Sequence, residues 1–112
     1  MYTQQNYLAE FKAITSRMYE ITEAKNSDYT GDTSDPFKNF KAVEMLGVTS
    51  VEVGFFTRMT DKMMRLGGFI KNGALKVKDE KIEDTLMDLA VYSILLICYL
   101  RSKRTVDREN TD

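Results

Sequence analysis

The 112-residue sequence has no histidine, no tryptophan, one cysteine and one proline. Because histidine is the commonest general base and transition-metal ligand, its absence excludes Ser-His-Asp and Cys-His catalytic sites and His-ligated zinc or iron within one chain. Any chemistry must therefore depend on carboxylates, lysines, arginines and tyrosines. A single cysteine cannot form an internal disulfide, and Cys98, within the apolar run 89–100, is expected to be a buried thiol.

An excess of one charge sign is also missing, because 16 Lys and Arg stand against 17 Asp and Glu. This balance argues against a basic nucleic-acid-binding protein and gives no indication of a membrane surface. Residues 1–10 have no basic segment followed by an apolar one, so we expect no export signal and a cytoplasmic location. The apolar run 89–100 has 12 residues, fewer than the roughly 20 of a membrane-spanning helix.

Apolar residues recur every three or four positions along most of the chain, which predicts an all-α protein. Residues 26–37 lack this period and are rich in turn formers, so they are expected to form a loop. The predicted fold is a four-helix bundle-like protomer with helices at about 3–25, 36–46, 50–72 and 79–104. These helices form a single domain over residues 1–105, and a frayed polar tail follows at 106–112.

Capping residues mark the expected helix ends. Asp35 followed by Pro36 is typical of an N-cap and first helical residue, and Gly47 is expected to end that helix. Thr49 and Glu52 have the spacing of a capping box at the start of the next helix. Asn72-Gly73 is expected to end that helix, and Asp79 is expected to cap the last one.

The last helix carries apolar residues nearly all round its axis between residues 86 and 100. A single four-helix layer cannot cover such a surface, and an apolar patch of this size is rarely left exposed to water. We therefore expect a homo-oligomer in which the 86–100 helix packs against its copy.

Glu80, Asp84 and Asp88 recur every four residues, which places three carboxylates on one side of the last helix. Asp88 has an ordinary explanation, an ion pair with a Lys or Arg of another helix. The alternative is magnesium, which prefers hard oxygen ligands. Glu20 and Glu23 supply a second acidic pair on the first helix.

Basic residues are grouped along the third predicted helix, where Arg58, Lys62 and Arg65 recur at intervals of four and three beside Asp61. Most patterns of this kind are solvated faces with weak internal ion pairs. The alternative is a cradle for a phosphate chain, because arginine gives bidentate contacts and lysine a point charge. Further basic residues surround the predicted loop, at Lys25, Lys38 and Lys41.

Four segments, 25–29, 35–40, 58–66 and 77–92, together resemble a phage-encoded family of small helical proteins, the nucleotide modification associated domain, type one. That family is similar to the all-α nucleoside triphosphate pyrophosphatases of the MazG-like and dimeric dUTPase-like group. The resemblance covers about residues 25–100. It implies an all-α oligomer whose wider relatives hold magnesium between acidic helices and hydrolyse a nucleotide between its α- and β-phosphates.

The resemblance also assigns roles to residues of this sequence. The metal ligands that it implies are Glu20, Glu23, Asp84 and Asp88, with Glu80, Asp84 and Asp88 as the catalytic carboxylates. The implied nucleotide contacts come from the loop, the short second helix and the basic helix: Lys25, Asp28, Tyr29, Phe37, Lys38, Asn39, Arg58, Asp61, Lys62 and Arg65. The base of the nucleotide is expected against Tyr29, Phe37 or Phe40.

Two positions depart from the family pattern. Val91-Tyr92 stands where the family usually has Asn-Tyr, and Thr30 separates Tyr29 from Gly31. The change at Val91 removes a polar group near Asp88, which weakens the expectation of hydrolysis more than that of nucleotide binding.

Three hypotheses follow. The first is a magnesium-dependent nucleotide pyrophosphatase, which the family name connects with modified-nucleotide metabolism. The second is a non-catalytic phage protein that sequesters a nucleotide or cyclic nucleotide signal against a host defence. The third is a structural helical oligomer whose charges only keep it soluble.

Overall fold

The computed structural model describes residues 1–30, 35–75 and 81–110, with side chains for all of these except 26–30 and 106–110. It contains α1 (Gln4–Thr30), α2 (Lys38–Met45), α3 (Val51–Asn72) and α4 (Ile82–Asn110). No strand occurs in the described ranges, which confirms the all-α class. The chain divides into two units, residues 1–36 and 37–112, and each is described by itself.

The first unit consists mainly of α1, which begins at a reciprocal cap. The Thr3 N–H donates to Asn6 Oδ1 at 2.9 Å and the Asn6 N–H donates to Thr3 Oγ1 at 3.1 Å. The helix continues to Thr30, so the expected loop is wrong for residues 26–30. These residues contain no glycine or proline to stop a helix, whereas Gly31 follows directly in the sequence. Residues 31–34 of the predicted loop lie outside the described residues.

The second unit begins with α2, whose N-cap is Phe37 rather than Asp35 as expected. No side chain caps this end, and the Phe37 carbonyl accepts the Lys41 N–H at 2.9 Å. The helix begins only after Phe37, because the Phe37 ring is buried in the core of the unit. The other end follows the prediction: Gly47 adopts φ 74°, which closes the helix in a left-handed turn.

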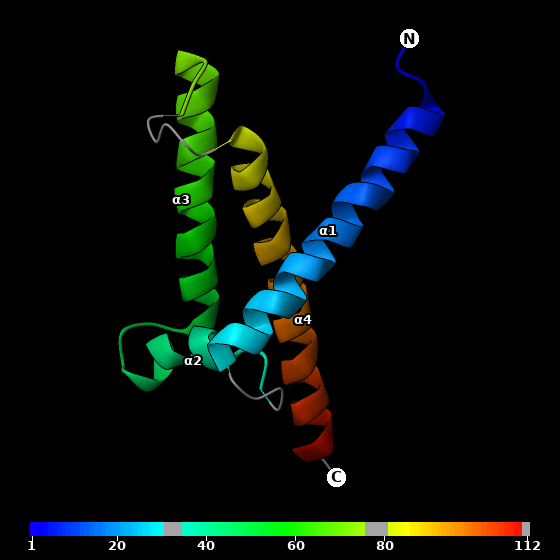
Figure 1. Ribbon diagram of the computed structural model, residues 1–112. Helices are drawn as coiled ribbons and strands as arrows, with labels where there is room; N and C mark the ends of the chain where they lie inside the picture. The colour runs from blue at the N-terminus through cyan, green and yellow to red at the C-terminus, as the bar shows by residue number, and fades with distance from the viewer. Residues whose placement is uncertain (31–34, 76–80, 111–112) are drawn as a thin grey trace. The chain divides into compact units, whose positions relative to one another are not determined.

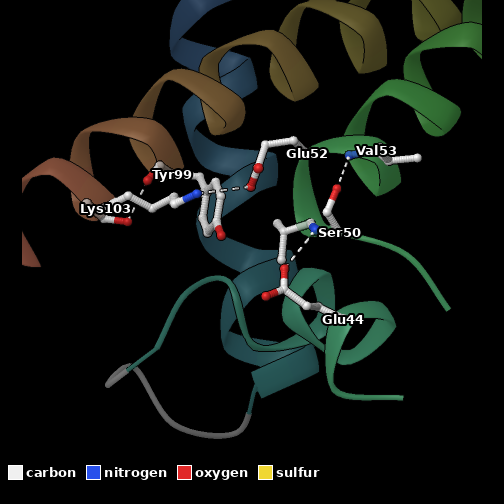
Figure 2. Close-up of polar contacts among 8 residues, drawn as sticks. Glu44, Ser50, Glu52, Val53, Tyr99 and Lys103 are labelled. Atoms are coloured by element: carbon white, nitrogen blue, oxygen red, sulfur yellow. Dashed lines mark hydrogen bonds and ion pairs between the residues drawn. The ribbon is translucent and has the colours of Figure 1, made fainter. Parts of the chain in front are cut away.

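A carboxylate and a hydroxyl together cap the start of α3 (Figure 2). Ser50 Oγ accepts the Val53 N–H at 3.2 Å, and a Glu44 carboxylate oxygen accepts the Val51 N–H at 3.1 Å. The cap is thus Ser50, one residue after the expected Thr49. Glu44 accepts a second N–H of the first turn, and its negative charge is stabilised near a helix N-terminus. The helix ends as predicted at Asn72, followed by Gly73 at φ 74°.

The last helix, α4, is longer than expected at its C-terminal end, since its backbone is helical to Asn110 rather than to about 104. The expected cap Asp79 lies outside the described residues. Over Ile82–Thr105, α4 is long and apolar enough to cross a membrane by length and composition, a test that core helices of soluble proteins also pass. Helix length therefore does not exclude a membrane span, contrary to the count based on the uninterrupted apolar run.

The helices α3 and α4 lie side by side and run in opposite directions (Figure 1). An aromatic cluster forms the centre of the second unit. Phe55 of α3 is fully buried. The centroid of its ring lies 4.2 Å from that of the stacked Phe40 ring and 6.2 Å from that of the Tyr99 ring. Phe37 meets Tyr99 edge to face at 5.5 Å. Complete burial of one phenylalanine contributes roughly 1.5–3 kcal/mol, so this cluster is the main attraction between the helices.

The face of α4 that packs on this cluster differs from the one that spacing predicts, which is Ile82, Leu86, Leu89, Ser93, Ile97 and Leu100. Tyr99 is buried, whereas Leu86, Ile97 and Leu100, expected on the core face, are at least 42% exposed. Cys98 is also exposed, so the expectation of a buried thiol is wrong for the single chain. Leu95 and Leu96 pack against the cluster beside Tyr99, so the inward side of α4 is the one that carries these three residues.

Burial raises the pKa of the Tyr99 phenol, and the nearby Glu52 and Glu44 carboxylates raise it further by disfavouring the phenolate. Since the folded pKa exceeds that of the unfolded chain, the free energy of unfolding should fall as the pH rises above about 10. Urea unfolding between pH 8 and pH 11 should show a shallower decline in Tyr99→Phe. Identical pH dependence in the two proteins would contradict this assignment.

Candidate functional site

The predicted acidic and basic helices meet at one ion pair. Lys62 Nζ of α3 lies 3.0 Å from Asp88 Oδ2 of α4, with side-chain exposures of 15% for Lys62 and 38% for Asp88. Asp88 therefore has the partner on another helix that its ordinary explanation requires. Because Lys62 is largely buried, removing Asp88 leaves a cation in poor contact with water, which is costly.

The two arginines of the same helix are also held by neighbours in this unit. The Arg58 guanidinium lies over the Phe40 ring, 4.7 Å from its centroid, an arrangement that favours a cation electrostatically. Arg65 Nε lies 3.2 Å from Asp61 Oδ2, one turn earlier on α3. Arg58, Lys62 and Arg65 thus form a basic strip along two turns of α3, and each cation has its own contact.

A second polar group lies at the other end of the helix pair (Figure 2). Lys103 Nζ of α4 is 3.6 Å from Glu52 Oε1 of α3 and 5.7 Å from the centre of the Tyr99 ring. Sequence analysis missed this group. The spacing of seven between Tyr92 and Tyr99, followed by Lys103 four residues later, places all three on one face and could have indicated it.

The aromatic residues expected to hold a base already have contacts within the unit. Phe40 stacks on Phe55, and the Arg58 guanidinium lies over the Phe40 ring. The centroids of the Phe40 and Tyr92 rings lie 6.5 Å apart, edge to face. Phe37 is buried against Tyr99. These rings form the core beneath the basic strip. A base would have to lie over exposed surface beside them or displace Arg58.

The remaining predicted residues are distributed between the two units. Lys38 and Asn39 are exposed in the first turn of α2, and Asp84 is exposed one turn before Asp88. Glu20, Glu23 and Lys25 are exposed on α1, in the first unit. Asp28 and Tyr29 belong to the helical end of α1, although their side chains are not described. Glu80 lies outside the described residues.

The described side chains of the second unit, those of 37–75 and 81–105, do not fit magnesium. No group of three Asp, Glu or Cys side chains that could hold a metal ion occurs in the described part of the chain. Asp88 is paired with a lysine, and Asp84 alone offers too few of the oxygen ligands that magnesium requires. The four-carboxylate set would join Glu20 and Glu23 of one unit to Asp84 and Asp88 of the other, and it stays a prediction.

No family model, curated protein or solved structure matches this chain. The resemblance to the nucleotide modification associated domain therefore stays a prediction, and function has to be argued from the side chains themselves.

The Lys62–Asp88 pair can be tested by a double-mutant cycle. We expect Asp88→Asn to lower the free energy of unfolding by about 1 kcal/mol, because the cation loses its partner. Lys62→Met, which keeps the length of the side chain, should largely abolish the cost of adding Asp88→Asn. Urea unfolding at one fixed protein concentration measures all four proteins, and additive effects of the two substitutions would contradict the pairing.

Proposed function

We propose that this protein binds a nucleotide or a nucleotide-derived phosphate compound at the basic strip Arg58, Lys62 and Arg65. The observation that supports the proposal is the arrangement of these cations on successive turns of one helix, with Lys62 and Arg58 held by contacts to other helices. Cations held in place lose less side-chain entropy when they bind a phosphate chain.

The chemistry of the strip suits phosphate groups. Arginine can donate two parallel hydrogen bonds to a phosphate, and lysine supplies a compact positive charge. Asp88 and Asp61 are the carboxylates that a phosphate would compete with, since they contact Lys62 and Arg65. Binding by this route needs no metal ion, and the positive charge on α3 supplies the attraction.

Hydrolysis of the nucleotide between its α- and β-phosphates is the further step that the resemblance predicts. It requires carboxylates that can organise water, and Asp84 is the exposed candidate on α4. The pairing of Asp88 with Lys62 favours binding without hydrolysis as the basal activity. A protein that holds a nucleotide or cyclic nucleotide signal unchanged fits this arrangement better than a hydrolase does.

The proposal includes an oligomer and a cytoplasmic setting, without a membrane or nucleic-acid partner. Leu86, Ile94, Ile97 and Leu100 of α4 are 42% to 50% exposed, and an apolar face of this kind is suited to packing against a copy. The contacts of Asp88 and Lys103 with α3 favour protein rather than lipid around α4, because charged groups are costly inside a bilayer.

Nucleotide binding can be measured directly by calorimetry of the full chain with each deoxynucleoside triphosphate and with cyclic dinucleotides, in magnesium and in EDTA. We expect one class to bind in both buffers, with the ligand recovered unchanged. Arg58→Ala combined with Arg65→Ala should weaken binding at least tenfold, since two phosphate-contacting charges are lost. Lys71→Ala, an exposed lysine at the end of the same helix, is the control and should bind normally.

The other outcomes separate the alternatives. Recovery of monophosphate and pyrophosphate would establish the pyrophosphatase instead of the passive binder. Absence of binding to every nucleotide would contradict the proposal and leave the structural oligomer.

A further inference from the structure

The three cations of the basic strip are held at separate points along α3. Arg58 is held by a ring of α2, Lys62 by a carboxylate of α4, and Arg65 by a carboxylate of its own helix. The rise of the helix separates Arg58 from Arg65 by about 10 Å along its axis. Cations held on different partners over this length cannot converge on one small anion while these contacts persist.

The contacts that hold the strip leave hydrogen-bond donors for a ligand. Lys62 Nζ has three N–H groups, and the Asp88 oxygen at 3.0 Å engages one of them. Arg58 meets the π face of Phe40, a contact that takes up none of its N–H donors. Charge-assisted hydrogen bonds to phosphate oxygens can therefore form without breaking either contact.

The Phe40 ring beneath Arg58 has no face left for a nucleobase. Phe55 stacks on it with ring centroids 4.2 Å apart and an interplanar angle of 7°, and the Arg58 guanidinium carbon lies 4.7 Å from the Phe40 centroid. Two groups this close would collide on one face, so they cover opposite faces of the ring. The Tyr92 ring meets Phe40 edge to face. The described side chains around the strip therefore offer more to a phosphate chain than to a base.

We propose that the basic strip recognises a linear chain of at least three consecutive phosphates, and that the number of phosphates determines affinity more than the base does. This inference rests on the proposed function and names its ligand class, the nucleoside triphosphates and other linear oligophosphates. Linked phosphates present their oxygens in a row, which can follow Arg58, Lys62 and Arg65 along α3. Each further phosphate reaches another cation and adds charge-assisted hydrogen bonds.

Calorimetry of the full chain in EDTA measures the dependence on phosphate number. Affinity should rise about tenfold or more at each step from orthophosphate to pyrophosphate to inorganic tripolyphosphate, because each step engages another cation. Fructose 1,6-bisphosphate, whose two phosphates are not consecutive, is the control for charge and should bind no more tightly than pyrophosphate. The different deoxynucleoside triphosphates should agree within about threefold.

The variant Arg65→Ala tests whether the strip is read along its length. It should abolish the gain in affinity from pyrophosphate to tripolyphosphate, since two strip cations then remain for either ligand. Lys71→Ala, at an exposed position of the same helix, is the matched control and should keep the wild-type gain. A gain that persists in Arg65→Ala would overturn the inference.

Failure of this inference and failure of the proposed function give different results. Binding of nucleoside triphosphates without binding of tripolyphosphate would overturn the inference and leave the proposed function intact. A preference of more than about tenfold for one base would do the same. Absence of binding to every nucleotide and to tripolyphosphate would contradict both.

Discussion

The second unit depends on the packing of Phe55 between Phe40 and Tyr99, which joins α2, α3 and α4. Two ion pairs flank this contact, Lys62–Asp88 toward one end and Glu52–Lys103 toward the other. Partly exposed ion pairs contribute up to about 1 kcal/mol each, less than the burial of a single large ring. The aromatic cluster thus supplies most of the attraction, and the two ion pairs are consistent with the same antiparallel register.

This register also determines what the basic strip can do. Because Lys62 is held by Asp88 and Arg58 by Phe40, two of the three cations are attached to the same packing that stabilises the unit. A phosphate chain bound there would meet cations with limited freedom. The same ion pair engages Asp88 Oδ2, an oxygen of the carboxylate that is also predicted as a magnesium ligand. In the proposed binding mode Asp88 is not needed as a metal ligand, whereas metal-assisted hydrolysis would require its carboxylate to coordinate the metal.

The sequence predicted the helices better than it predicted their faces. Heptad-like spacing and turn residues placed α3 within one residue of its observed limits, since Asn72-Gly73 stops a helix by local chemistry alone. The end of α1 was missed because residues 26–30 are polar and look like a loop, although nothing among them breaks a helix. The Glu44 contribution to the α3 cap is a contact across a turn, which spacing does not reveal.

The site was predictable where one helix supplied its residues. Arg58, Lys62 and Arg65 share a face by spacing, and Asp88 was identified as the acid in need of a partner. The choice of Lys62 as that partner required the α3–α4 register, and the contact of Arg58 with Phe40 required the position of α2. The set of four carboxylates from two units was assembled only by resemblance, and the described side chains of the second unit contain no metal-binding group of three.

The most direct test of the central claim, that the basic strip binds phosphate without a metal ion at Asp88, is nucleotide affinity measured by calorimetry in Asp88→Asn. Removal of the competing negative charge should leave binding in EDTA at least as tight as in the wild-type protein. Loss of binding, or a wild-type affinity that depends on magnesium and disappears in Asp88→Asn, would contradict the account.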